Sequence, residues 1–343
     1  MSQPTSLRIC GLDLIRVVAI FFVIAGHFFV LHTSLMNVPF NNLCLFLQAM
    51  LKDIFCIGVP LFIMLTGYLN SSKPPTKKYY RGMVRVLIAY LLFSIITILF
   101  RKYYIGEEHT LLQWGMKILD YSAIPYAWYI EMWIGLAMLA PFLNYMYKAI
   151  PTRNQKLMLL GSLFAMTSLP DLFNRYGMYL VPAYFSKAAY PLMFYFIGTF
   201  IREYQFKIKH WQGWTLIIAM SMVTPLFNIV VFRGNSDLVQ VAGGPGGVFH
   251  SWIAVAIFLM LYKRDISILP LKRWVTHCSL VSLEMYLCCW MFDMLYYPWF
   301  KDRFFETQAQ FFPWFFVIVP LIFLSSYVVA SVYRVIATRL HIN

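Results

Sequence analysis

Two ionisable side chains in the first apolar stretch of the chain, Arg16 and His27, have the spacing of residues on one helix face. They lie in LDLIRVVAIFFVIAGHFFVLH, residues 12–32, which is long enough to cross a bilayer once as a helix. At 3.6 residues per turn their separation is close to three turns, which places His27 about 16 Å further along the axis. Ionisable groups at membrane depth are costly and usually face a bundle interior or a watery cavity.

These residue types can bind phosphate and transfer protons. A guanidinium binds phosphate oxygens bidentately, and a buried, neutral imidazole accepts a proton or becomes acylated. Asp13 precedes Arg16 by three residues and is placed to pair with it. The alternative is that Asp13 and Arg16 mark the helix start and His27 is a structural histidine. The membrane cost favours the functional interpretation, and His32 is expected on a different face of the helix.

The composition indicates a polytopic membrane protein. Of the 343 residues, 61% are hydrophobic and 12% are charged, about half the charged share of a soluble domain. The net charge of +14 is interpreted as a bias of cations toward the cytoplasmic loops and toward anionic lipid headgroups. The chain has no basic run typical of nucleic-acid binding, and no nucleic-acid partner is expected.

Hydrophobic runs of spanning length predict an all-α bundle of about ten transmembrane helices in a single domain, residues 1–343. The runs are 12–32, 47–69, 83–100, 126–147, 156–170, 187–202, 211–232, 247–262, 275–297 and 312–333. Lys and Arg are concentrated in alternate connections, which predicts that both termini are cytoplasmic. Arg16 is then near the cytoplasmic surface, and His27 lies past the midplane. The outer connection 101–125 contains a mildly amphipathic stretch.

Further polar residues in or beside these runs are candidates for a site. Arg81 and Arg85, spaced i, i+4, are predicted to converge with Arg16 on the phosphates of a cytosolic ligand. Lys73 and Lys77 are interpreted as ordinary topology signals. Glu131 and Glu284 are preferred among the intramembrane polar residues, since a carboxyl there can be protonated, pair with an arginine or orient a histidine. The others are Asn144, Asn228 and Asp293.

No metal site or disulfide framework is predicted. The cysteines Cys10, Cys44, Cys56, Cys278, Cys288 and Cys289 lack metal-ligand spacing with a histidine and fall mostly in or beside apolar runs. No nucleophile elbow for a Ser-His-Asp arrangement is evident.

Several segments, in order, resemble the acyltransferase family 3 membrane proteins. LDLIRVVAIFFVIAGHF is similar to the first helix of that family, with ten residues between its arginine and histidine. GVPLFIMLTGYL, YYRGMVRVLIAY, AWYIEMWIGLAMLAPFL, YPLMFYFIGTFI and SLVSLEMYLCCW resemble later segments. Three departures stand out: the paired arginines are one residue further apart, no proline follows Arg85, and Cys289 stands where a late histidine is common.

The resemblance implies transfer of an acyl group, commonly acetyl from acetyl-CoA, to a hydroxyl of an envelope carbohydrate. It implies a ten-helix bundle around a central cavity in the bacterial inner membrane, with acyl-CoA, membrane lipids and a carbohydrate or lipid-linked glycan as partners. The expected catalytic residues are His27 and Glu131, and Arg16, Arg81 and Arg85 are expected to bind acetyl-CoA. Trp128, Tyr129 and Glu284 are assigned to the substrate.

A transporter or exporter of a small molecule or glycan intermediate is the rival from another class, because polar residues inside a bundle also suit a substrate pathway. The chain has no internal repeat and no matched pair of interrupted helices, which favours the enzyme. The identity of the acceptor and the choice between general base and acyl relay stay open at the level of sequence.

Overall fold

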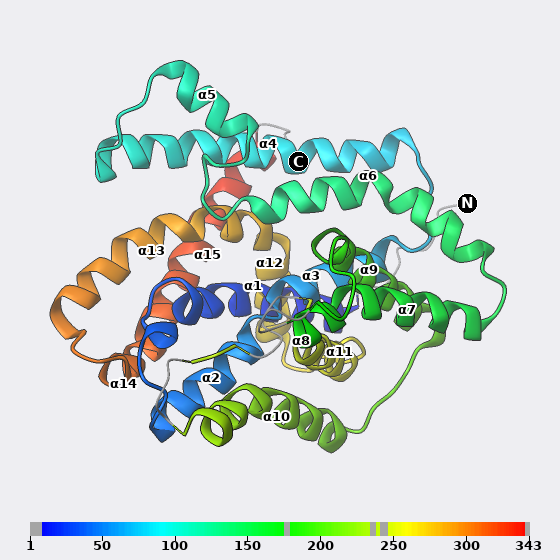
Figure 1. Ribbon diagram of the computed structural model, residues 1–343. Coiled ribbons are helices and arrows are strands. Elements are labelled where there is room, and N and C mark those ends of the chain that lie inside the picture. Colours follow the sequence, from blue (N-terminus) through cyan, green and yellow to red (C-terminus); the bar gives the residue numbers. More distant parts are fainter. Residues whose placement is uncertain (1–8, 175–178, 234–237, 241–245, 340–343) are drawn as a thin grey trace.

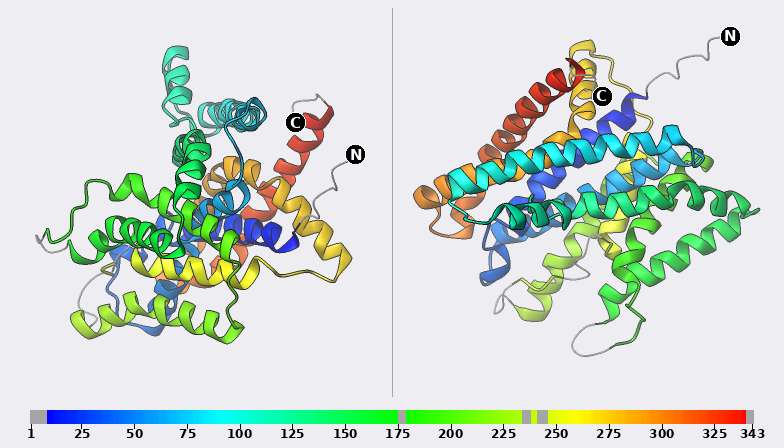
Figure 2. Two further views of the ribbon diagram at one scale, coloured as in Figure 1. Left: turned by 90° about the vertical axis from the view of Figure 1, so that its right-hand side faces the viewer. Right: turned by 90° about the horizontal axis from the view of Figure 1, so that it is seen from above.

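The protein folds into α-helices throughout the part of the chain that the computed structural model describes, residues 9–174, 179–233, 238–240 and 246–339. Those residues contain no strand, as predicted. Figure 1 shows the helices in chain order, and Figure 2 shows two further views. The long helices α4 (Lys77–Phe100) and α6 (Trp128–Ala149) lie side by side in all of these views.

Helix α1 (Cys10–Val30) is the centre of the bundle. It packs against α2, α3, α11, α12, α13 and α15. These helices run over Leu43–Phe55, Gly58–Asn70, Val248–Leu261, Leu269–Leu280, Ser282–Phe304 and Phe315–Arg339. Most residues of α1 are buried, so the helix that carries Arg16 and His27 is held from several sides.

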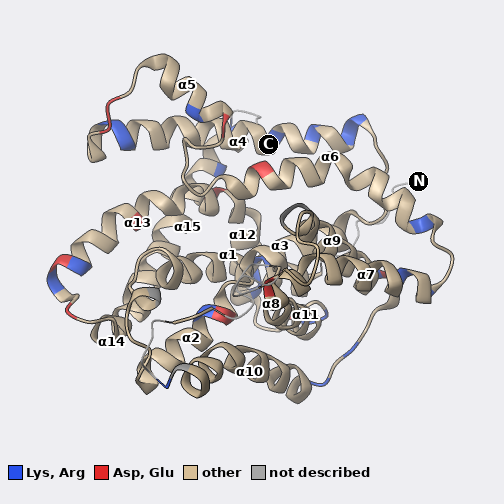
Figure 3. Ribbon diagram, viewed as in Figure 1, with Lys and Arg blue, Asp and Glu red and all other residues tan. Residues whose placement is uncertain are grey.

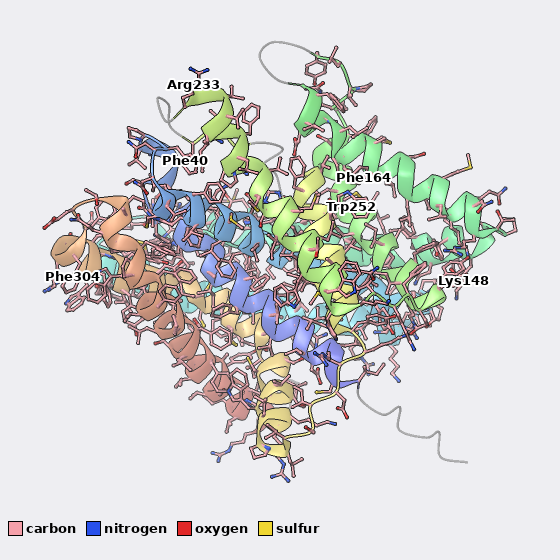
Figure 4. All side chains as sticks on the ribbon, turned by 90° about the horizontal axis from the view of Figure 1, so that it is seen from below. Phe40, Lys148, Phe164, Arg233, Trp252 and Phe304 are labelled. Carbon is pink, nitrogen blue, oxygen red and sulfur yellow. The ribbon has the colours of Figure 1, made fainter. Side chains whose placement is uncertain are left out.

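The remaining helices complete the shell around this centre. They are α5 (Leu111–Leu119), α7 (Arg153–Thr167), α8 (Leu169–Phe173), α9 (Ser186–Tyr204), α10 (His210–Phe227) and α14 (Gln308–Phe311). Figure 4 shows the side chains that fill the spaces between helices, with Phe164 of α7 beside Trp252 of α11. Their ring centroids are 6.3 Å apart.

Each of the ten predicted hydrophobic runs falls on a helix, although fewer satisfy strict criteria for a membrane span. Six spans in the described residues are long and apolar enough, or seven if the bent pair α12 and α13 counts as one. The other three predicted runs correspond to α6, α9 and α11, which do not meet the same length and composition criteria. The chain is a multi-pass membrane protein, and the count of ten is approximate.

The second predicted run, residues 47–69, lies within one candidate span, Leu43–Asn70, whose helix is interrupted at Cys56 and Ile57. Helix α2 ends at Phe55 and α3 begins at Gly58, where the chain turns against α1. A Cβ atom on Gly58 would lie 2.7 Å from the carbonyl oxygen of Ala19, so glycine permits this approach. The break brings residues at the end of α2 to the His27 end of α1.

Helices α3 and α9 cross at two glycines. A Cβ atom on Gly67 would collide with the carbonyl oxygen of Tyr195, and one on Gly198 would collide with that of Met64. Small residues let two backbones touch in this way in membrane bundles. The glycines that close two of the family-like segments therefore set the separation of these helices.

The connection 101–125 contains the short helix α5, as the amphipathic stretch predicted. Arg101, just after α4, holds the two ends of this connection together: its guanidinium pairs with Glu107 at 2.7 Å and donates to the carbonyl of Ala123 at 3.0 Å. The hydrogen bond from Arg101 lowers the pKa of Glu107. Figure 3 shows most Lys, Arg, Asp and Glu residues near helix ends and in connections, which leaves the middles of most helices uncharged.

Candidate active site

Arg16 and His27 lie on the same helix and each lines a cavity of its own. The Arg16 cavity has a volume of about 300 Å³. It is lined by Arg16, Phe62, Leu65, Thr66, Leu69, Asn70, Lys73, Val86, Tyr129, Ile130, Trp133, Ser282, Leu283 and Tyr286. The His27 cavity, about 270 Å³, is lined by Phe22, Val23, Gly26, His27, Val30, Leu31, Lys52, Phe55, Cys56, Gly58, Val59, Tyr126, Trp128 and Tyr286.

His27 faces a buried carboxylate. Its Nδ1 lies 3.5 Å from Oδ2 of Asp293, which is on α13 and is completely buried. The His27 side chain is 15% exposed. Nδ1 is buried and has no hydrogen-bond partner among the described residues, with Asp293 as its charged neighbour, which leaves Nε2 as the ring nitrogen for a molecule in the cavity. A carboxylate in this position orients an imidazole and stabilises the imidazolium that forms when it takes up a proton.

Two more side chains hold the same carboxylate. The hydroxyl of Tyr126 donates to Asp293 Oδ2 at 2.7 Å, and His32 Nε2 lies 3.1 Å from that oxygen. His32 Nε2 is also 2.9 Å from the Tyr126 hydroxyl, and the ring of Tyr126 lies 4.0 Å from that of His27. His27, His32, Tyr126 and Asp293 therefore form one connected group, which we call the Asp293 cluster.

The expectation that His32 lies apart from the site is wrong. Helix α1 ends at Val30, so His32 is no longer on a helix face, and the chain carries its ring back toward α13. The ring stacks on that of Tyr297 with centroids 4.0 Å apart. A helical wheel extended through His32 could not have predicted this.

The carboxylate beside His27 is not one of the two that the sequence favours. Glu131 is exposed on α6, and Glu284 is half-buried near the start of α13, where the charge of Arg334 acts on it. The structure brings neither to His27. Both stand in the first turn of their helices, where a carboxylate favourably meets the helix dipole, whereas Asp293 is in a helix interior.

Cys289, at the place of the late family histidine, is fully buried one turn before Asp293 on α13. Its thiol lies 3.2 Å from the carbonyl oxygen of Tyr286, so it is used within the helix. The polar side chain that α13 sends to His27 is Asp293 instead.

Arg16 is held in place at the mouth of its cavity. Its Nη1 donates to the hydroxyl of Ser279 at 2.9 Å, and the same hydroxyl donates to Asp13 at 2.7 Å. The predicted pairing of Asp13 with Arg16 is present, at 4.0 Å. The guanidinium remains partly exposed, so an anion in the cavity can approach it.

The predicted convergence of Arg81 and Arg85 with Arg16 is wrong. Both side chains are exposed on α4, and neither lines the Arg16 cavity, whereas Val86 does. The cation that accompanies Arg16 there is Lys73, from the connection between α3 and α4. The i, i+4 spacing placed the arginines on one face of α4 correctly, but that face points away from the bundle.

A family model described as an acyltransferase domain matches residues 10–331. The chain belongs to acyltransferase family 3. The match begins with α1 and extends into α15, so it includes Arg16, His27 and Asp293. No curated protein and no solved structure matches the chain.

In this acyltransferase, Tyr286 separates the two cavities. Its side chain lines both, its hydroxyl donates to the backbone carbonyl of Tyr126, and its ring meets that of Tyr129 edge-on at 5.4 Å. Tyr129 thus belongs to the Arg16 side and Trp128 to the His27 side. Among the residues described, no group of three His, Cys, Asp or Glu side chains could hold a metal ion.

Proposed function

We propose that this protein is a membrane O-acyltransferase of the bacterial inner membrane. It takes an acyl group, commonly acetyl, from cytosolic acyl-CoA and transfers it to a hydroxyl of an envelope carbohydrate. The proposal depends on the arrangement of two cavities along α1. His27 meets Asp293 at one of them, and Arg16 of α1 lines the other together with Lys73. The family supplies the reaction class.

On the donor side, the phosphates of acyl-CoA bind Arg16 and Lys73. Arg16 offers a fork of donors to phosphate oxygens, and Lys73 adds a point charge. The cations concentrated at alternate connections support a cytosolic position for this cavity, since acyl-CoA is made in the cytosol. The pantetheine arm then extends along α1 toward Tyr286 and His27.

On the acceptor side, His27 is the general base. Its Nε2 takes the proton of the acceptor hydroxyl, the oxygen attacks the thioester carbonyl, the C–O bond forms and the C–S bond breaks. The leaving CoA thiolate takes up a proton. Asp293 holds the imidazole and offsets its positive charge, and Tyr126 and His32 hold Asp293.

An acyl relay through His27 fits the same geometry. In that version Nε2 attacks the thioester first, the C–S bond breaks and CoA leaves as the thiolate. The acceptor oxygen then attacks the acyl-imidazole, the N–C bond breaks, and the hydroxyl proton returns to the imidazole or to the thiolate. The two cavities on either side of Tyr286 support a relay. In a relay the donor thioester and the acceptor hydroxyl react with His27 one after the other, so they need not lie beside it together. A radiolabelled acetyl group bound to the protein before acceptor is added would identify the relay.

The test is transfer by purified protein in lipid vesicles supplied with labelled acetyl-CoA. Release of free CoA together with label on an added glycan hydroxyl is the expected result. Absence of turnover and of binding with acetyl-CoA and longer acyl-CoAs, alongside flux of a solute through the same vesicles, would reject the enzyme in favour of a transporter.

A further inference from the structure

A second buried charged group lies beside the His27 cavity and has no part in the proton transfer. Lys52, near the end of α2, lines this cavity together with His27, yet it is only 5% exposed. The next residue, Asp53, is 1% exposed. An ammonium group buried at membrane depth is strongly disfavoured unless an anion or several hydrogen bonds compensate it. The contacts of the Lys52 ammonium therefore show whether its charge is compensated within the protein.

The direct partner of Lys52 is neutral. Its ammonium donates to Oε1 of Gln240, and Nε2 of Gln240 donates to Asp53 at 2.9 Å. His250 of α11 approaches the same oxygen of Asp53, at 3.4 Å, so that carboxylate already has two partners. Within the described residues, no carboxylate oxygen lies within 4.0 Å of the Lys52 ammonium.

The wall of the His27 cavity supplies no anion either. Apart from Lys52 and His27, its described polar side chains are those of Tyr126, Trp128, Tyr286 and Cys56. Asp293 contacts His27 from outside the lining and is engaged by the rest of the Asp293 cluster. A cation among apolar walls interacts with an anion far more strongly than it would in water.

We propose that Lys52 binds an anionic group of the acyl acceptor, a carboxylate or a phosphate, and so positions the acceptor hydroxyl at His27. The inference rests on the proposed function, since it requires an acceptor in the His27 cavity. Both residues line one cavity of about 270 Å³, so a single sugar unit with its charged substituent touches both. The acceptor class is then an acidic or phosphorylated sugar rather than a neutral one.

The competing role is internal: Lys52 would only offset the charge of Asp53. The two roles differ in what they make of the acceptor. If Lys52 only offsets Asp53, replacing it lowers stability but leaves the ratio of kcat/KM between charged and neutral acceptors unchanged. If Lys52 binds the acceptor, replacing it changes that ratio.

The experiment compares matched acceptors in vesicles with labelled acetyl-CoA. One pair is a uronic acid glycoside and its methyl ester, and the other is a sugar phosphate and the unphosphorylated sugar; the two pairs distinguish carboxylate from phosphate. The native protein should prefer one charged member by roughly 10- to 100-fold in kcat/KM, the range expected for a charge-assisted hydrogen bond. Lys52→Gln should bring that ratio close to one, while Lys52→Arg should retain most of it.

Lys102→Gln is the matched control, because it removes an equal charge from an exposed position in the outer connection. It should leave the ratio unchanged. Transfer without any charge preference in the native protein, or a preference that survives in Lys52→Gln, would overturn the inference while the proposed function stands. If Lys52→Gln does not fold, Lys52→Arg and the native ratio decide. Failure of transfer and of acetyl-CoA binding altogether would overturn both.

Discussion

Asp293 Oδ2 lies 3.5 Å from Nδ1 of His27, and this contact joins α13 to α1 beside the His27 cavity. It gives a histidine at membrane depth a charged partner, and a carboxylate in this position can fix the ring and stabilise its charged form. The same oxygen binds Tyr126 and His32, so the surroundings of His27 involve three further side chains, Asp293, Tyr126 and His32, from three parts of the chain.

Replacing either member of this pair should stop transfer without abolishing donor binding. His27→Gln retains size and some hydrogen bonding but cannot accept a proton near neutral pH, so kcat should fall by roughly 10²–10⁴-fold or more. Asp293→Asn should cause a loss of similar order, because the amide cannot stabilise an imidazolium. Turnover of labelled acetyl-CoA, measured beside its equilibrium binding, checks both variants; near-normal kcat in His27→Gln would make it a structural histidine.

His32→Gln should reduce kcat by roughly 10-fold, less than the loss in His27→Gln. His32 acts on His27 only through Asp293, which keeps its 2.7 Å hydrogen bond from Tyr126 when His32 is replaced, and outer partners of this kind typically contribute 10- to 100-fold. His210→Gln is the control, since His210 is exposed at the start of α10. Equal rates in the two variants would show that His32 has no influence on the site.

Replacing the cations of the Arg16 cavity should weaken acyl-CoA binding more than replacing the arginines of α4. Arg16→Ala and Lys73→Ala should each weaken binding by roughly 10-fold, the order of one charge-assisted contact to phosphate. Arg81→Ala and Arg85→Ala should change it little, because both side chains are exposed away from the Arg16 cavity. Titration with a fluorescent acyl-CoA measures all four. Stronger effects from the α4 arginines would contradict the placement of the donor.

Opposite ends of α4 should be accessible from opposite sides of the membrane. Lys78→Cys lies at its basic end and Glu108→Cys lies in the connection after its other end, and both positions are exposed. With the cytosolic termini proposed from the loop charges, a membrane-impermeant maleimide should label position 108 from outside and position 78 only after the membrane is permeabilised. The unsubstituted protein gives the background from its six native cysteines. Labelling of both positions from outside would reject the orientation.

The sequence predicted what depends on local periodicity and missed what depends on long-range packing. The α-helical fold, the span of α1, the face shared by Arg16 and His27, and the Asp13–Arg16 pair all follow from residues close together in the chain. Asp293, Tyr126 and Lys73 come from other helices or connections, and no spacing rule reveals that they meet α1.

One local signal would have improved the choice of carboxylate. Glu131 and Glu284 stand in first turns, where an acidic residue stabilises the helix by itself, and Asp293 has no such reason to be where it is. A carboxylate in the interior of a spanning helix therefore points more strongly to a partner. The outward orientation of Arg81 and Arg85 had no comparable signal, because spacing defines a face of α4 but not the direction in which it points.

The glycines at the crossing of α3 and α9 should be more sensitive to substitution than a glycine elsewhere in a helix. Gly67→Ala or Gly198→Ala would drive a methyl group into the carbonyl oxygen of Tyr195 or Met64, and a backbone atom cannot rotate away. Overpacking of this kind typically costs about 1–3 kcal/mol, and here it forces the helices apart. Both variants should show a lower Tm in detergent.

Gly161→Ala provides the comparison for this pair. Gly161 is inside α7, and no neighbouring atom lies within 4 Å of the place that an alanine methyl group would take, so alanine there should leave Tm unchanged or raise it through better helix propensity. The crossing also reaches the proposed donor site, because α3 supplies Phe62, Leu65 and Thr66 to the Arg16 cavity. Gly67→Ala should therefore weaken acyl-CoA binding as well as lower the Tm. If its Tm equals that of Gly161→Ala and its acyl-CoA binding is unchanged, the crossing tolerates a methyl group.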